Sequence, residues 1–209
     1  TILKNPLKQL FTVFKEEKIR KLSLAFFIYF IAFTGLTNIL IFFLQESLNW
    51  TTKASSGTLV VVGVIAIIVQ GGLIGPLVKQ FGEMRLTLIG SGFILLACAL
   101  LITAPKENAM INIYSAVSFL AVGAGLITPT LRALISKKLD VDKQGSILSN
   151  LQGLQSLGGV LGIAMAGRVY DSFGPKSPFI AGSIILLFMI YLIAEGKSNN
   201  SFNNQKSNY

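Results

Sequence analysis

Among the polar side chains inside the long apolar stretches of this 209-residue sequence, five are candidates for binding a ligand: Thr34, Asn38, Gln70, Gln152 and Gln155. Thr34 and Asn38 are one helical turn apart, so they would share one face of a helix. Gln152 and Gln155 would do the same. Such groups can orient a mostly apolar ligand in a cavity. Alternatively, they only hydrogen-bond to neighbouring helices, which contributes about 0.6 kcal/mol each.

The residue types that are missing from the sequence limit the functions that it can have. It contains no histidine, and Cys98 is its single cysteine. Histidine is the commonest general base and metal ligand, so we expect no catalytic residue, no metal site and no cofactor, and an intramembrane enzyme is the least favoured class. No Asp or Glu lies at the middle of an apolar stretch, where a proton relay normally needs one. The sequence therefore shows no complete proton-coupling site.

Six apolar stretches must position these side chains, approximately at residues 22–44, 57–78, 86–104, 111–135, 147–169 and 178–194. Each is near the ~20 residues with which a helix crosses the hydrocarbon core of a bilayer. A chain segment inside lipid must satisfy its own backbone hydrogen bonds, so these stretches are predicted helices. We predict an all-α membrane protein with a six-transmembrane-helix bundle at residues 22–195. A cytoplasmic linker or interfacial helix, residues 1–21, precedes it, and a disordered cytoplasmic tail, residues 196–209, follows.

The basic residues give the topology. The net charge is +9, but only 13% of the residues are charged, and most lysines and arginines fall into every second loop. By the positive-inside rule both termini are cytoplasmic, as an even number of crossings requires. The charge therefore indicates a multi-pass protein of the plasma or inner membrane, and no nucleic-acid partner is expected.

A further group of residues is suited to helix packing or pivoting: Gly123, Gly125, Pro129, Arg132, Gly158, Gly159 and Gly162. Small residues let helix backbones approach closely in lipid. The same stretches could instead form an interface that slides between two states of a carrier. Arg132 lies near the cytoplasmic end of its helix, and we expect it to snorkel to the interface or to pair with Asp140 or Asp142.

The loop at residues 75–85 resembles the second-half copy of the loop signature of the major facilitator superfamily, Gly-x-Leu-x-Asp-Arg-x-Gly-Arg-Arg. The residues that we assign to this signature, and to gating, are Gly75, Leu77, Lys79, Gly82 and Arg85. Lys79 stands where the signature has Asp, Gln80 where it has Arg, and Glu83 at the next basic position. The glycine turn carries over, whereas the charge network of the signature is altered.

Residues 123–136 and 144–145 resemble the tenth helix, and residues 147–169 the eleventh helix, of the drug:proton antiporter branch, which includes tetracycline and multidrug exporters. The resemblance implies the carboxy-terminal half of a twelve-helix carrier, with the cavity between the two halves. It places Asn38, Gln70 and Gln152 on the cavity wall. The acid that carries the proton would lie in the missing amino-terminal half.

The expected function is proton-coupled efflux of a small, largely apolar molecule by alternating access. The expected partners are the lipid bilayer, the small-molecule substrate, protons, and the amino-terminal half or a second copy of the chain. Two alternatives stay open. A transporter-derived binding or sensor protein would bind substrate without flux, and a stand-alone six-helix unit would work as a homodimer.

Overall fold

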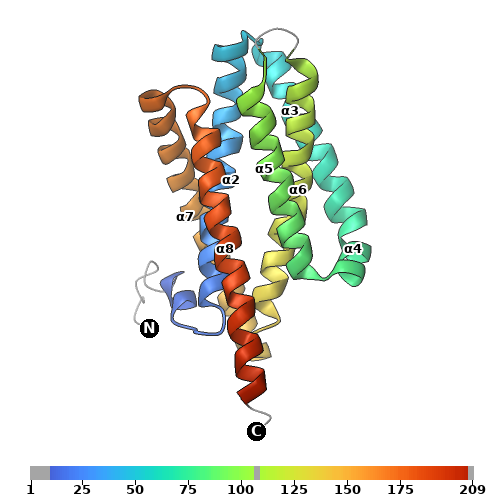
Figure 1. The fold of residues 1–209 in the computed structure, drawn as a ribbon, viewed down its shortest axis with the longest axis vertical. Helices are drawn as coiled ribbons and strands as arrows, with labels where there is room; N and C mark the ends of the chain where they lie inside the picture. Colours follow the sequence, from blue (N-terminus) through green and yellow to red (C-terminus); the bar gives the residue numbers. More distant parts are fainter. Residues whose placement is uncertain (1–9, 106–108, 207–209) are drawn as a thin grey trace.

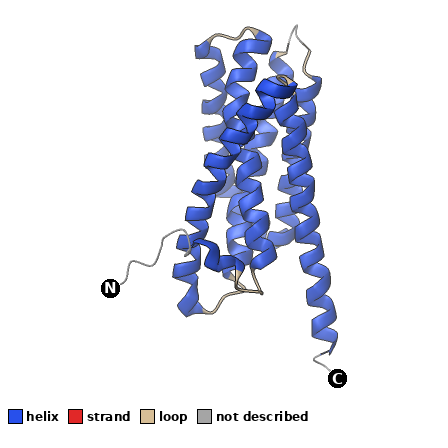
Figure 2. Ribbon diagram, turned by 90° about the vertical axis from the view of Figure 1, so that its left-hand side faces the viewer, coloured by secondary structure: helices blue, strands red, loops and turns tan. Residues whose placement is uncertain are grey.

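The computed structural model describes residues 10–105 and 109–206, with side chains up to residue 195, and folds them into an elongated helical bundle (Figure 1). The elements are η1 (Phe11–Phe14), α2 (Arg20–Leu48), α3 (Thr52–Ile68), the π-helical turn η2 (Val69–Leu73), α4 (Ile74–Phe81), α5 (Glu83–Thr103), α6 (Met110–Ser136), α7 (Val141–Phe173) and α8 (Ser177–Lys206). The described residues contain no strand (Figure 2).

Six long rods make up the bundle, because α3, η2 and α4 form one continuous helix. Within the described residues, five of the rods are long and apolar enough to cross a membrane: α2, the rod Thr52–Phe81, α5, α6 and the Ser177–Glu195 part of α8. The sixth, α7, has 33 residues and packs along α2, but its glycines and amides make it less apolar. The predicted all-α six-helix bundle is confirmed.

The helix boundaries differ from the predicted spans mostly by extension. α7 begins at Val141 and ends at Phe173, one turn or more beyond the predicted stretch at each side. α8 continues to Lys206, although the composition predicts a disordered tail from residue 196. Extending an existing helix fixes one residue per added hydrogen bond and needs no new nucleus, so a polar segment can continue it. Disorder of this tail in solution stays a prediction, and its residues 207–209 lie outside the described part.

The segment before α2 folds against the ends of two helices. The short η1 buries Val13, and Leu10 contacts Gly153 of α7. The Asn150 side-chain amide donates a hydrogen bond to the Thr12 hydroxyl, at 3.1 Å. Residues 1–9 of the predicted linker lie outside the described residues. The described part is therefore a short 3₁₀ helix attached to α7, where the sequence predicts a linker or interfacial helix.

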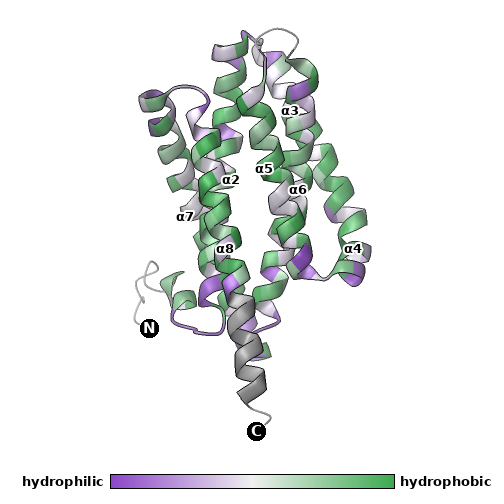
Figure 3. Cartoon of the chain, in the orientation of Figure 1, coloured by the Kyte–Doolittle hydropathy of each residue, from purple (hydrophilic) through white to green (hydrophobic). Residues whose placement is uncertain are grey.

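The order of the helices brings the basic loops to one end. α2 and α7 run parallel and pack along each other, α5 packs against α6, and α8 lies on α2 and α5. The amino terminus, the α4–α5 turn, the α6–α7 loop and the carboxyl terminus all lie at the lower end of the bundle in Figure 1. The middle of the bundle is hydrophobic, and hydrophilic residues lie toward its two ends (Figure 3). The common position of these loops and termini is the arrangement that the positive-inside pattern predicts.

Two helix crossings depend on glycine. A Cβ atom added to Gly162 of α7 would lie 2.2 Å from the Ile31 carbonyl oxygen of α2, and one added to Gly35 would lie 2.8 Å from the Gly162 carbonyl oxygen. Between α5 and α6, a Cβ atom on Gly123 would lie 2.6 Å from the Gly90 carbonyl oxygen. The neighbouring atoms are backbone, so a larger residue can only push the helices apart.

The rod Thr52–Phe81 is interrupted at its centre by η2. Pro76, one turn further on, has no N–H group, and its ring crowds the carbonyl group of the preceding turn, so the helix widens there. Val69 is the buried residue of η2, and its Cγ1 atom would lie 2.9 Å from a Cβ atom on Gly125 of α6. Pro129 lies inside α6, which continues through it. A pivoting role for Pro129 stays a prediction.

Candidate functional site

A cluster of polar side chains joins α6 to α7. Arg132 of α6 donates hydrogen bonds from Nη2 to the side-chain oxygens of Gln152, at 2.6 Å, and of Gln155, at 2.5 Å. Gln152 is exposed, whereas Gln155 and Arg132 are half-buried. The Arg132 Nε atom is buried and has no hydrogen-bond partner among the described residues. We call Arg132, Gln152 and Gln155 the arginine–glutamine cluster.

Aromatic residues of α2 form the third side of this cluster. The Arg132 guanidinium carbon lies 5.8 Å from the centre of the Phe26 ring, a cation–π distance. One turn further along α2, the buried Tyr29 hydroxyl lies 3.3 Å from the Thr128 hydroxyl of α6. Thr128 and Arg132 are one turn apart on α6, so the contacts with α2 follow one face of each helix. The site is thus built by α2, α6 and α7.

The structure brings together only part of the predicted cavity set. Gln152 and Gln155 lie on one face of α7 and share one partner. Asn38 is exposed, and its amide donates to the backbone oxygen of Thr34 within α2, at 2.9 Å. Thr34 faces α7 near Gly159. Gln70 is exposed on η2. A cavity role for all five residues stays a prediction.

Arg132 has other partners than the sequence analysis expects. Within residues 10–105 and 109–195, its guanidinium binds two neutral amides of α7 and no carboxylate, whereas the sequence offers Asp140 and Asp142 as nearby acids. The three ion pairs among the described residues join Lys21 to Glu195, Lys137 to Glu83 and Lys143 to Glu16. The positive charge of Arg132 is therefore not balanced by an acid in the described part of the chain.

The predicted packing glycines lie at helix contacts of different tightness. Gly123 and Gly162 lie at the close crossings, and a Cβ atom on Gly158 would lie 3.1 Å from the Phe27 carbonyl oxygen. A Cβ atom on Gly159 would lie 3.6 Å from Thr34, an ordinary contact. Gly125 faces Val69 of η2. A sliding role for these contacts stays a prediction.

The loop signature forms the turn between α4 and α5. Gly82 has a φ angle of +76°, which favours glycine, and it ends α4 and precedes α5. A Cβ atom on Gly75 would meet nothing within 4 Å. Lys79 and Arg85 are exposed, and Leu77 is half-buried. Among these five residues, Gly82 is the one at which the backbone conformation accounts for the choice of glycine.

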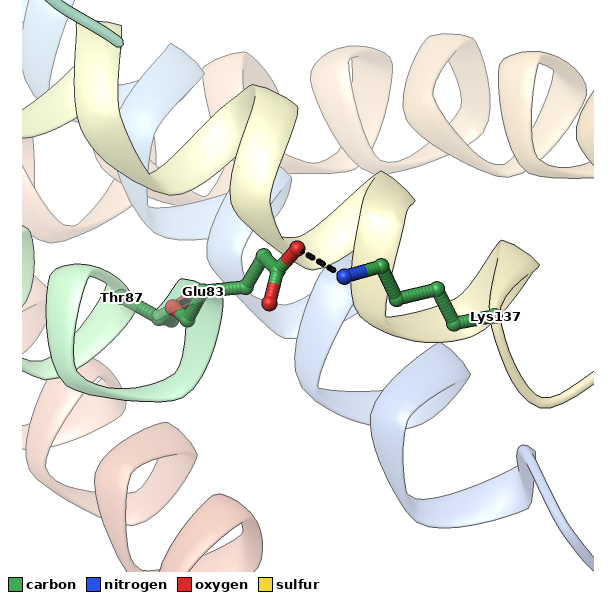
Figure 4. Close-up of polar contacts among 3 residues, drawn as sticks. All are labelled: Glu83, Thr87 and Lys137. Carbon is green, nitrogen blue, oxygen red and sulfur yellow. Dashed lines mark hydrogen bonds and ion pairs between the residues drawn. The ribbon is translucent and has the colours of Figure 1, made fainter. Parts of the chain in front are cut away.

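An ion pair beside this turn ties α5 to α6. The Glu83 carboxylate accepts a hydrogen bond from the Lys137 ammonium group at the end of α6 (Figure 4). The Thr87 hydroxyl lies one turn further along α5 and is 2.8 Å from the Thr130 hydroxyl of α6. The superfamily signature has a basic residue at the position of Glu83, so this ion pair places an acid where the signature has a base.

Sequence reasoning missed three parts of this arrangement. Phe26 is one of 15 phenylalanines, and nothing in its neighbourhood distinguishes it. Lys137 reads only as a basic loop residue, although Glu83 in a usually basic position is a signal that a cation lies opposite. Thr87 and Thr130 are hydroxyls within apolar stretches and are detectable by the criterion that selects Thr34.

The fold and this site define a multi-pass integral membrane protein with a polar cluster in a helical wall. A sequence profile of the Major Facilitator Superfamily matches residues 3–163, which is more than half of the chain. The chain therefore belongs to the Major Facilitator Superfamily. Its members are transporters, so the chain belongs to a transporter family and not to an enzyme family.

The curated relatives extend this result. The chain is 26% identical over 130 residues to a class C tetracycline resistance protein of Escherichia coli, which covers 62% of this chain and 32% of that protein. It is 28% identical over 157 residues to a class G tetracycline resistance protein of Vibrio anguillarum, covering 71% and 38%. It is 22% identical over 212 residues to the human Hippocampus abundant transcript-like protein 1, covering 91% and 41%. The chain thus spans about a third to two-fifths of these relatives.

Proposed function

We propose that this chain is the carboxy-terminal six-helix half of a secondary active exporter, which moves a small, largely apolar molecule by alternating access in exchange for protons. The observation that carries the proposal is the combination of six long helices with the superfamily match. The lengths of the relatives, which exceed the matched part by more than twofold, support a second half.

The proposed cavity wall is the face made by α2, α6 and α7. It contains the arginine–glutamine cluster and the Tyr29–Thr128 contact, which are polar groups in an otherwise apolar bundle. The rod Thr52–Phe81 would flank it. Only 11% of the rod's most apolar 18-residue segment is buried. Most of its surface is therefore free to face lipid or the amino-terminal half of the carrier.

We place both termini in the cytoplasm of a plasma or inner membrane. The support is the grouping of the basic loops at the end of the bundle where the termini also lie. The acid that carries the proton is assigned to the amino-terminal half. Among the described residues of this chain, carboxylates lie toward the helix ends, as with Glu46 and Glu83.

The experiment is solute transport by the polypeptide encoded by the complete reading frame around this chain. The purified protein is reconstituted into liposomes, a proton gradient is imposed, and accumulation of tetracycline, the compound in the names of two relatives, is measured. Gradient-dependent accumulation that a protonophore abolishes supports the proposal. Binding without accumulation would instead select a sensor, and transport by this 209-residue chain as a crosslinkable dimer would select the homodimer.

A further inference from the structure

We propose that the arginine–glutamine cluster binds an anionic group, such as a carboxylate, on the molecule that the carrier transports. This inference rests on the proposed transport function and narrows its substrate class. The substrate would then be a largely apolar molecule with one anionic end, and Arg132 would be its charge-recognising residue.

The positive charge of Arg132 lacks a carboxylate partner among the described residues. A guanidinium group stays positively charged in proteins, and a charge in an apolar bundle is costly unless it is paired. Among the described residues, Lys21, Lys137 and Lys143 each have a carboxylate partner, whereas the half-buried Arg132 forms no ion pair and donates to two neutral amides. Arg132 therefore has a positive charge that an incoming anion can balance.

The polar groups that the arginine–glutamine cluster leaves unused are hydrogen-bond donors. Arginine only donates hydrogen bonds, so Gln152 and Gln155 must turn their carbonyl oxygens toward Nη2. Their amide NH₂ groups are then directed away from the guanidinium and remain as donors. The guanidinium keeps the Nε and Nη1 donors, and Nε is buried and without a hydrogen-bond partner among the described residues. All the remaining polar capacity of Arg132 is donor capacity, which suits an anion and not a cation.

The donor that Arg132 leaves open is Nη1. A carboxylate on a guanidinium edge uses Nη2 together with Nε or with Nη1. Nη2 already donates to both glutamines and Nε is buried, so an incoming anionic oxygen reaches Nη1 first. The Phe26 ring is fully buried, and its centre lies 5.8 Å from the guanidinium carbon, so it supports Arg132 from the inside of the bundle. Gln152 is exposed, so the cluster is accessible from the open side of α7. These features favour an anionic group that approaches Arg132 from the side of Gln152.

The carboxylate has two possible sources, the substrate or an acid in the amino-terminal half. We assign it to the substrate because Arg132 is fixed by α7 and α2 on the wall that the proposed function gives to the cavity. A protein carboxylate would make a permanent pair that blocks added anions. The two sources therefore differ in whether a free carboxylate binds.

The test uses the complete protein in detergent with chloride-free buffer, and the probes are benzoate and its neutral isostere benzamide. Binding is measured by calorimetry for wild type, Arg132→Gln, Arg132→Lys and the matched control Arg168→Gln. Arg168 is an exposed arginine near the opposite end of α7. We expect benzoate to bind wild type and the control about tenfold or more tightly than benzamide. Arg132→Gln should remove that difference, and Arg132→Lys should retain only part of it.

Equal binding of benzoate and benzamide, or full benzoate affinity in Arg132→Gln, overturns the proposal. Failure of the wild-type protein to bind benzoate at millimolar concentration also overturns the proposal. If the wild type fails in this way and Arg132→Gln lowers the melting temperature, Arg132 is already paired with a carboxylate of the protein. The experiments distinguish an error in the proposed anion site from an error in the proposed transport function. Benzoate binding through Arg132 without any solute flux removes transport alone, and tetracycline transport with unchanged benzoate binding in Arg132→Gln removes the site alone.

Discussion

Replacing Gly162 by alanine should separate α2 from α7 and destabilise the bundle. The new Cβ atom would lie 2.2 Å from the Ile31 carbonyl oxygen and 3.1 Å from the Gly35 nitrogen. Both are backbone atoms, so no side chain can rotate away. To reach an ordinary contact of 3.4 Å, the helices must move apart by about 1.2 Å at the crossing.

The cost follows from packing. Overfilling a well-packed contact costs typically 1–3 kcal/mol, and a clash with the backbone of α2 belongs at the upper end. Alanine returns up to about 1 kcal/mol through its better helix propensity. The expected net loss is about 2 kcal/mol, which corresponds to roughly a 30-fold change in the unfolding equilibrium.

The assay is equilibrium unfolding in mixed micelles with increasing sodium dodecyl sulfate, followed by helical circular dichroism and by the fluorescence of Trp50, the single tryptophan. Gly159→Ala is the matched control, because it lies on the same helix and its Cβ atom would meet Thr34 at 3.6 Å. The control should be unchanged or slightly more stable. If Gly162→Ala unfolds at the same detergent fraction as the control, α2 and α7 are not in backbone contact and the account of this crossing is wrong.

Three further predictions concern the α4–α5 turn, the ion pair beside it and the α2–α6 contact. Gly82 has φ +76° and ψ 157°, a region that is nearly exclusive to glycine, so Gly82→Ala should cost about 1–3 kcal/mol. Gly75→Ala, in open space, should be neutral in the same unfolding assay. Glu83→Lys and Lys137→Glu should each destabilise, and the double charge swap should restore stability; a double-mutant cycle should give a coupling of about 1 kcal/mol. An additive double variant would contradict this pair. Tyr29→Phe should cost about 0.6 kcal/mol, the average value of a hydrogen bond in a membrane bundle, and a stabilised variant would show that the Thr128 contact is not a hydrogen bond.

The sequence predicts the helical rods well because each must cross a fixed thickness of hydrocarbon. Segment length and apolar content are local properties, so they can be counted along the chain. The end of α8 is less predictable, since composition favours disorder from residue 196 while the helix continues to Lys206. The interruption at η2 depends on Pro76 and on packing against Gly125, and only the proline is visible in the sequence.

The candidate site is predictable in part for the same reason. The three-residue spacing of Gln152 and Gln155 indicates a shared face, because both residues lie on one helix. Their partner Arg132 comes from another helix, and the acids near Arg132 in the sequence are not its partners in space. Partner choice depends on how α6 crosses α7 and α2, which spacing along the chain does not encode.

The most direct test of the proposed carrier is the accessibility of α7 from the two sides of the membrane. In the complete protein, the buried Cys98 is replaced by serine, and single cysteines are introduced at Gln152 and at Ile184, which is 63% exposed on α8. Labelling with a membrane-impermeant maleimide is measured from each side. Alternating access predicts that Gln152→Cys reacts from the cytoplasmic side, that substrate changes its rate, and that Ile184→Cys stays unreactive in lipid. A Gln152→Cys variant that is as unreactive as Ile184→Cys from both sides would contradict a cavity on this wall.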